Sequence, residues 1–227
     1  MVKKYNIYVE GGGDSKSLSI KCQMGFRAFF EKAGLRGAMP TVIPCGSRNK
    51  AYDRFRIAVK QGLKAFLLVD SEAPVDAKYM TGDPESWQPW RHLHQVDGWT
   101  QPASSSDHDC HLMVQVMESW FLTDKNTLAD FFGQDFREKA LSAQSSIEAV
   151  SKGSVYQSLK NATRDCSTKG SYEKGKHSFK IIERISPDKV CAASPWAKRF
   201  IDAMLKQSKA GPGASGPQPP VRKLRIR

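Results

Sequence analysis

The sequence predicts an α/β protein in which a mainly parallel four-stranded sheet is flanked by helices and followed by a helical, basic C-terminal region. Three observations lead to this prediction. Short apolar strands alternate with amphipathic helices in the first 135 residues, three of the strands run into acidic residues, and the excess positive charge lies in the second half. The simplest arrangement for a β-α-β-α-β order is a parallel sheet with right-handed crossovers.

The first predicted strand covers residues 4–9, a β-branched and aromatic run that stops at Glu10 and is followed by three glycines. Glycine permits positive φ angles and lets a ligand approach the backbone closely. A helix is expected over residues 15–33, because apolar side chains recur there at steps of three and four. Gly34 follows where such a helix would end.

Two more strands are expected at 40–44 and 65–69, joined by a helix that begins near 46–50 and closes at Gly62. The later strand stops on Asp70, which is followed closely by Glu72. Residues 71–110 then break the rhythm with four prolines and three tryptophans. They predict an insertion over the strand ends, with a short helix around residues 87–95.

A fourth strand is expected at 111–117, running into Glu118, with a helix over about 120–132. The following sequence is helical and rich in lysine. Its predicted segments lie near 136–143, 145–160, 177–185, 187–193 and 195–207. We therefore expect three regions: a catalytic α/β domain at 1–135 that includes the 71–110 insertion, a helical basic region at 136–207, and a disordered basic tail at 208–227.

The net charge of +12 is unevenly distributed along the chain. Residues 1–135 contain 16 basic and 16 acidic side chains, residues 136–205 contain 13 and 7, and the remainder contains six basic and no acidic ones. This asymmetry points to nucleic acid as a partner, although a basic surface without a partner stays open.

The composition also bears on the compartment. No stretch approaches the ~20 apolar residues that a membrane helix needs, and the chain enters a strand without a signal peptide. The five cysteines include no Cys-x-x-Cys pair, which favours reduced thiols. We therefore expect a cytoplasmic protein that does not associate with a membrane.

Acidic residues that follow parallel strands predict one site at the C-terminal edge of the sheet, where α/β folds bind ligands. Glu10, Asp70 and Glu72 are the first candidates for metal ligands, and Asp14 and Glu118 are the next. Carboxylate oxygens favour Mg²⁺ or Mn²⁺, which would polarise a phosphodiester and activate water. The alternative for each acid is a solvated residue in a turn.

Residues suited to binding phosphate occur in two places, at the start of the helix after residue 46 and after the loop at 163–177. One lysine of the second group is also expected to be catalytic, because its charge would neutralise the scissile phosphate. We assign this role to Lys176. For any single lysine, a solvated helix start remains the alternative. The predicted phosphate-binding residues are Ser47, Arg48, Lys50, Lys174, Lys176, His177 and Lys180.

A nucleotide-binding P-loop fits the glycine-rich turn poorly. The run from Gly11 to Ser17 resembles the end of the motif, but Glu10 and Ser15 occupy its two required glycine positions. A carboxylate at the mouth of a phosphate-binding loop repels the ligand unless a metal intervenes.

Zinc and thiol chemistry are also less favoured. Residues 107–111 contain several potential zinc ligands, and His92 and His94 lie in the same insertion, but no second pair has zinc-finger spacing. Neither Cys45 nor Cys110 has the local signature of a nucleophile.

With these motifs assembled, the chain resembles the Toprim-like proteins of bacteria, in particular the DUF4276 family, over about residues 4–205. The resemblance rests on Val-Glu10-Gly-Gly-Gly-Asp14, on Leu-Val-Asp70-Ser-Glu72, on the run from 111 to 122 around Glu118, and on residues 174–177, Lys-Gly-Lys-His. Toprim domains occur in topoisomerases, primases and overcoming-lysogenization-defect (OLD) nucleases. They bind Mg²⁺ through a strand-end glutamate and an Asp-x-Asp pair.

The resemblance implies that Glu10 corresponds to the Toprim glutamate, which acts in proton transfer, and Asp70 to the first metal-binding aspartate. Glu72 stands in the second aspartate's place and lengthens that arm. The implied function is a Mg²⁺-dependent nuclease acting on DNA or RNA in anti-phage defence, beside an ATPase partner. The alternative is a non-catalytic Toprim-like subunit that binds nucleic acid or regulates an ATPase-containing complex.

Overall fold

The computed structural model describes residues 5–13, 15–144 and 146–209. Its centre is a four-stranded sheet of β1 (Asn6–Val9), β2 (Thr41–Pro44), β3 (Ala65–Asp70) and β4 (Cys110–Met113). The strands run parallel in the order β2-β1-β3-β4. The predicted α/β class with a parallel four-stranded sheet is therefore confirmed.

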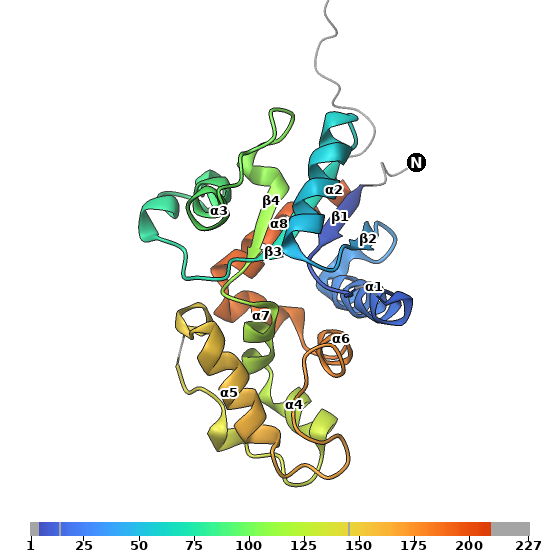
Figure 1. The fold of residues 1–227 in the computed structure, drawn as a ribbon, viewed down its shortest axis with the longest axis vertical. Helices are drawn as coiled ribbons and strands as arrows, with labels where there is room; N and C mark the ends of the chain where they lie inside the picture. The colour runs from blue at the N-terminus through green and yellow to red at the C-terminus, as the bar shows by residue number, and fades with distance from the viewer. Residues whose placement is uncertain (1–4, 14, 145, 210–227) are drawn as a thin grey trace, which may run out of the picture.

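Alternate residues of each strand pack into two separate hydrophobic cores. On β3, all six residues are buried; Phe66 and Leu68 face one core, whereas Leu67 and Val69 face the other. This near-continuous apolar run is typical of a parallel strand covered on both faces. The covering is visible as helices in front of and behind the sheet (Figure 1).

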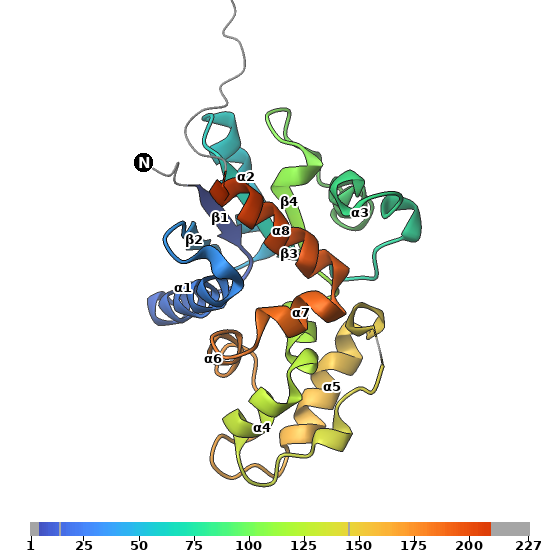
Figure 2. The ribbon, with the colours of Figure 1, turned by 180° about the vertical axis from the view of Figure 1, so that it is seen from behind.

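One face of the sheet packs against α2 (Arg48–Lys60) and α3 (Pro89–Asp97), and the other against α1 (Lys16–Phe30) and α8 (Pro195–Lys209). Figure 2 shows α8 crossing the back of the sheet. The C-terminal region therefore shares its core with the sheet rather than forming one of its own.

The remaining helices gather beyond the end of the sheet, in the lower half of Figure 1. They are α4 (Lys125–Phe132), α5 (Lys152–Thr163), α6 (Ser178–Ile182) and α7 (Pro187–Ala193). Their buried side chains join the same core as α1 and α8. This helical layer stands next to the carboxyl ends of the strands, where the candidate site lies.

Arg199 ties α8 to the predicted insertion. Its guanidinium, 5% exposed, donates to the carbonyl oxygens of Pro84 at 2.7 Å, Asp107 at 2.7 Å and Cys110 at 2.9 Å, and lies 3.1 Å from His111 Nδ1. Because a buried charge needs such partners, Arg199 fixes the 71–110 segment against the sheet. His111, which contacts Arg199, is itself buried in the core.

Several predicted boundaries are wrong. The strand expected at 111–117 ends at Met113, and a 3₁₀ helix (Met117–Thr123) precedes α4, which begins where the Asp124 side chain accepts from the Thr127 backbone N–H. In the segments expected at 136–143 and 145–160, the described residues before α5 form only the short 3₁₀ turns Glu138–Ala140 and Ile147–Ala149.

The start of α5 has a local cause, because Ser151 caps it at the backbone N–H of Ser154. The first two residues of the predicted tail at 208–227 belong to α8, which ends at Lys209; the rest of the tail lies outside the described part of the chain. None of the described helices combines the length and apolarity required to cross a membrane.

Candidate metal centre

Three carboxylates meet at the C-terminal edge of the sheet. Glu10 follows β1, Asp70 is the last residue of β3, and Glu72 comes two residues later. One oxygen from each lies within 4.8 Å of the others. Within the described residues, this is the one group of three or more acidic, histidine or cysteine side chains whose atoms converge in this way. The metal ligands ranked first from the sequence are therefore brought together.

Glu10 is held from two sides. Its Oε2 accepts a hydrogen bond from the backbone N–H of Asp70 at 3.0 Å and lies 3.5 Å from Arg48 Nε. Burial raises the pKa of Glu10 to about 7, although this hydrogen bond and the charges of Arg48 and Lys174 act in the opposite direction. The nearby Glu72 carboxylate adds to the increase.

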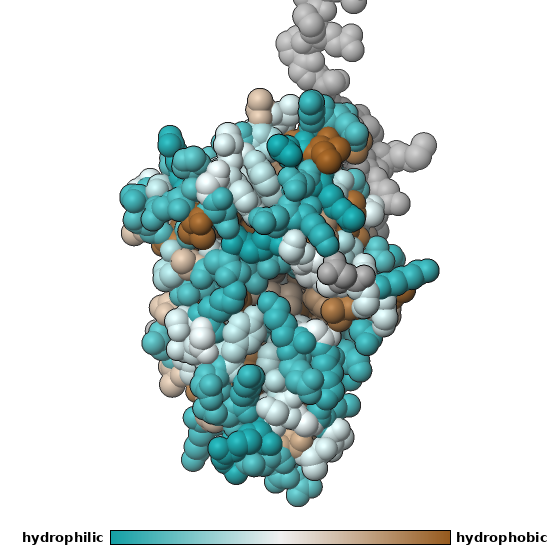
Figure 3. All heavy atoms as spheres, viewed as in Figure 1, coloured by the Kyte–Doolittle hydropathy of each residue, from teal (hydrophilic) through white to brown (hydrophobic). Residues whose placement is uncertain are grey.

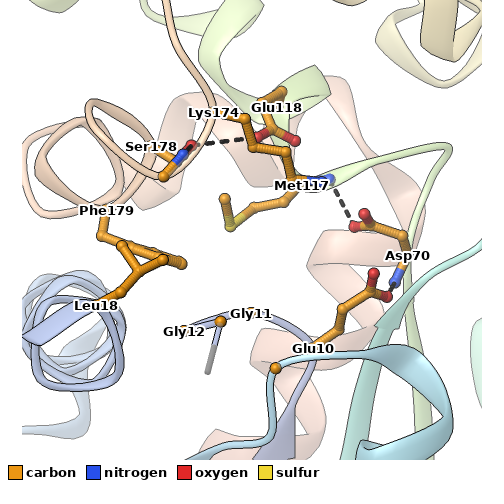
Figure 4. A pocket seen from close by; sticks show the side chains of 13 residues that line it. Glu10, Gly11, Gly12, Leu18, Asp70, Met117, Glu118, Lys174, Ser178 and Phe179 are labelled. Atoms are coloured by element: carbon orange, nitrogen blue, oxygen red, sulfur yellow. Dashed lines mark hydrogen bonds between the residues drawn. The ribbon is translucent and has the colours of Figure 1, made fainter. Parts of the chain in front are cut away.

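Asp70 lies deeper, with 2% of its surface exposed. Its Oδ1 accepts from the backbone N–H of Met117 at 2.8 Å, a contact drawn in Figure 4. Burial, together with repulsion from Glu10 and Glu118, raises the pKa of Asp70 well above its usual value. A cation bound here would reverse this effect, because it favours the ionised carboxylates.

Glu72 occupies a left-handed backbone conformation, with φ at +64°. Such a φ is uncommon outside glycine, asparagine and aspartate, and it costs free energy. The backbone N–H of Glu72 donates to the Gln115 carbonyl at 2.9 Å, and its Oε2 forms an ion pair with Lys152 Nζ on α5. These contacts hold the carboxylate beside the strand ends.

The glycines after Glu10 are required by close packing. Gly11 exchanges two backbone hydrogen bonds with Gly46, at 2.9 and 2.7 Å, and its φ is +126°. Gly12 has a φ of +88°, and a Cβ atom there would lie 2.7 Å from Pro44 Cβ. The turn thus passes close to the end of β2 and leaves space in front of the carboxylates.

This space is a cavity of about 250 Å³, part of which is drawn in Figure 4. Carboxylates and Lys174 form its polar side, and apolar side chains of α1, α6 and the 3₁₀ helix form the other. It is lined by Glu10, Gly11, Gly12, Gly13, Leu18, Gly46, Asp70, Met117, Glu118, Lys174, Gly175, Ser178 and Phe179.

Glu118 lines the cavity but is engaged by three hydroxyl groups. Its Oε1 accepts from Tyr172 at 2.9 Å and Ser178 at 3.2 Å, and its Oε2 accepts from Tyr156 at 3.0 Å. The side chain is fully buried. Glu118 lies outside the converging group of three, and its contacts make it an anchor for the surrounding helices.

Lys174 is the cation of the cavity. Burial tends to lower its pKa, but the Glu118 and Asp70 carboxylates raise it above the usual value, so that the ammonium stays charged. Figure 4 shows Lys174 beside Glu118. Of the seven residues expected to bind phosphate, Lys174 is the one that lines this cavity.

The predicted residues at the start of α2 have structural partners. Ser47 caps the helix by accepting from the backbone N–H of Lys50 at 3.3 Å. The Arg48 guanidinium forms two hydrogen bonds with Asp97, both at 2.9 Å, and lies 5.2 Å from the centre of the Trp99 ring. Arg48 is thus oriented by the insertion and positions Glu10.

The other predicted basic residues lie away from the cavity lining. Lys176 Nζ pairs with Glu173 at 2.9 Å on the exposed side of its turn. His177 is buried; its Nδ1 accepts from the backbone N–H of Glu173, and its ring packs against Phe132. Lys180 is exposed on α6. Asp14, a predicted metal ligand, lies outside the described residues.

Sequence reasoning missed the residues that complete the site from distant segments. Lys152 pairs with Glu72 across 80 positions, and Tyr156 and Tyr172 reach Glu118 from α5 and the following loop. The helical spacing of Lys152 and Tyr156 was visible in the sequence. No sequence signal connected either residue to the acidic strand ends.

A comparison with protein-family models identifies the relationship of the chain. The model of DUF4276, a domain of unknown function, matches residues 9–205. The chain belongs to the DUF4276 family. The match spans Glu10, Asp70, Glu72 and Lys174, so the whole candidate site lies within the family domain. Comparisons with curated proteins and with solved structures give no significant match.

Proposed function

We propose that this DUF4276 protein is a Mg²⁺-dependent nuclease that hydrolyses phosphodiester bonds in DNA or RNA. The observation that carries the proposal is the convergence of Glu10, Asp70 and Glu72 oxygens within 4.8 Å at the end of a parallel sheet. Three carboxylates at such a distance repel one another and favour a divalent cation, and hard oxygen ligands suit Mg²⁺ or Mn²⁺.

The hydrogen bonding of the three carboxylates fits this metal. One oxygen of each carboxylate accepts a hydrogen bond: Glu10 from the Asp70 N–H, Asp70 from the Met117 N–H, and Glu72 from Lys152 Nζ. Their second oxygens, Oε1 of Glu10, Oδ2 of Asp70 and Oε1 of Glu72, accept no hydrogen bond from the described residues. Each carboxylate thus keeps an oxygen available as a ligand.

The residues of the chain then have distinct roles. A bound Mg²⁺ would supply Lewis-acid activation of the phosphate and of the attacking water. Asp70, Glu72 and Glu10 would hold the ion, and the Glu10 carboxylate, as the acid/base linked to the metal, would accept the proton that the water loses. The Lys174 ammonium offsets the negative charge that develops on the phosphate oxygens. Arg48 keeps the Glu10 carboxylate in place through its contacts with Asp97 and Glu10.

The wider proposal is a Toprim-like enzyme of anti-phage defence that works with an ATPase partner in the cytoplasm. Its Toprim-like part is supported by the strand-end order of Glu10, Asp70 and Glu72 and by the four-stranded parallel sheet. The defence role, the ATPase partner and the compartment rest on the sequence resemblance and composition. Glu72 stands where Toprim proteins carry an aspartate, and in this chain the longer side chain comes with a left-handed backbone and an ion pair to Lys152.

The experiment is cleavage of mixed single- and double-stranded DNA and RNA by the full chain, with Mg²⁺ or Mn²⁺ and with EDTA. We expect metal-dependent cleavage that Glu10→Gln and Asp70→Asn abolish. Glu183→Gln changes an exposed carboxylate in the turn after α6, which does not line the cavity, and serves as the matched control. Equal cleavage by all four proteins would refute the mechanism. Mn²⁺ calorimetry separates the alternative, because a non-catalytic subunit with a vestigial site would bind no ion.

A further inference from the structure

A basic groove runs along α5 beside the candidate metal centre. Lys152, Tyr156 and Lys160 recur at intervals of four residues, which places them on one face of the helix. Together with Tyr172, Glu173 and Lys174 they line a groove of about 550 Å³. The surface of this part of the molecule is mostly hydrophilic (Figure 3).

The groove joins the metal centre at two points. Lys152 forms the ion pair with Glu72, one of the three carboxylates. Lys174 lines both the groove and the carboxylate cavity. Between them, Tyr156 donates its hydroxyl to Glu118 at the cavity wall, so the ring is fixed as the floor of the groove.

The charge of the groove is positive. Three lysines line it against one acidic residue, Glu173, which is paired with Lys176. Two of the lysines, Lys152 and Lys174, face carboxylates of the metal centre. Lys160 is exposed, and its ammonium forms no ion pair with any residue of the described ranges. An exposed lysine without an ion-pair partner among the described residues is available to a phosphate.

We propose that this groove binds a single nucleic-acid strand and leads its backbone into the carboxylate cavity, with phosphates at Lys160 and Lys152. This inference rests on the proposed nuclease function. The eight residue steps from Lys152 to Lys160 span about 12 Å along the helix. That length corresponds to about three nucleotides of a stacked strand. Asp70, at the end of the path, is 2% exposed, so the outside of a rigid duplex would not reach it, and the proposed ligand is therefore a single strand that can bend.

The test is binding of a fluorescent single-stranded oligonucleotide to the full wild-type chain in EDTA, where no cleavage is expected. Lys160→Ala should weaken binding several-fold at ~0.1 M salt, and Lys160→Glu should weaken it more than tenfold. The slope of log affinity against log salt should fall by about one for Lys160→Ala. Lys60→Glu, at the last residue of α2 and outside the groove lining, is the matched control and should bind as the wild type does.

Three results would overturn the groove: no binding by the wild type, equal binding by Lys160→Glu and Lys60→Glu, or tighter binding of a duplex of the same length. The outcome is separable from that of the proposed function. Binding that depends on Lys160 without any metal-dependent cleavage would support the proposed groove and refute the proposed nuclease function. Metal-dependent cleavage together with unchanged binding by Lys160→Glu would support the nuclease function and refute the groove.

Discussion

Replacing Glu10 by glutamine should make the metal-free protein more stable, although it removes the centre of the proposed site. Glu10 has its pKa raised from 4.5 to about 7, chiefly by burial. A difference of this size between the folded and unfolded states corresponds to about 3 kcal/mol once the carboxylate is ionised in both. Glutamine keeps an oxygen for the Asp70 N–H and carries no charge to bury.

The sign of the effect follows from the two pKa values. Because the folded pKa lies above the unfolded one, the folded wild type binds more protons between about pH 4.5 and 7, and its stability falls as the pH rises through this window. The variant escapes this loss. The advantage of Glu10→Gln should therefore be about 3 kcal/mol at pH 8 and below about 1 kcal/mol at pH 5.

Urea unfolding in EDTA at both pH values measures this difference. The loss of attraction to Arg48 is already contained in the pKa of Glu10, and Arg48 retains Asp97 as its partner. Glu183→Gln, at an exposed position, should change stability by less than ~0.5 kcal/mol at either pH. The reasoning fails if Glu10→Gln is no more stable than the wild type at pH 8. When Mg²⁺ replaces EDTA, we expect it to stabilise the wild type and not the variant.

Three further predictions concern the metal, the charge balance and the packing of the site. Mn²⁺ should bind several-fold more tightly at pH 8 than at pH 6, measured by calorimetry, because Glu10 titrates near pH 7 and cannot ligate well when protonated; equal affinities would contradict this. Lys152→Met should strengthen Mn²⁺ binding in the absence of nucleic acid, because Glu72 loses its competing cation; weaker binding would mean that Lys152 orients Glu72 for the metal. Gly25→Ala should destabilise the protein by about 1–3 kcal/mol in urea unfolding, since its Cβ would lie 2.5 Å from the Phe179 carbonyl oxygen where α1 meets α6; unchanged stability would show that the two helices separate easily.

The sequence was sufficient to predict the sheet and the three converging carboxylates. Short apolar strands with helices between them allow few arrangements, and acids at the carboxyl ends of parallel strands must meet at one edge. Glu10, Asp70 and Glu72 are therefore accessible to prediction from local patterns alone. The same argument placed Glu118 at this edge, but not the three hydroxyls that engage it.

The choice among basic residues was beyond the sequence. Lys174 and Lys176 are two positions apart in a glycine-containing loop, and the composition treats them alike. The turn before α6 directs Lys174 into the cavity and Lys176 outward to Glu173. Lys152 could not be connected to the site for a different reason: its partner Glu72 is 80 residues away, and no local pattern joins the two residues. Such contacts depend on how α5 packs beside the strand ends.

The charge balance of the site links the proposed metal to the proposed substrate strand. Without a metal, a cation faces each carboxylate: Arg48 lies near Glu10, Lys152 pairs with Glu72, and Lys174 lies near Asp70. A divalent ion at the carboxylates would compete with Lys152 for Glu72 and release its ammonium toward the α5 groove. A phosphate bound in the groove would in turn draw Lys152 away from Glu72 and open the site to the ion. Each ligand therefore removes a cost from the binding of the other, and because such coupling is reciprocal, metal and nucleic acid should bind with positive cooperativity.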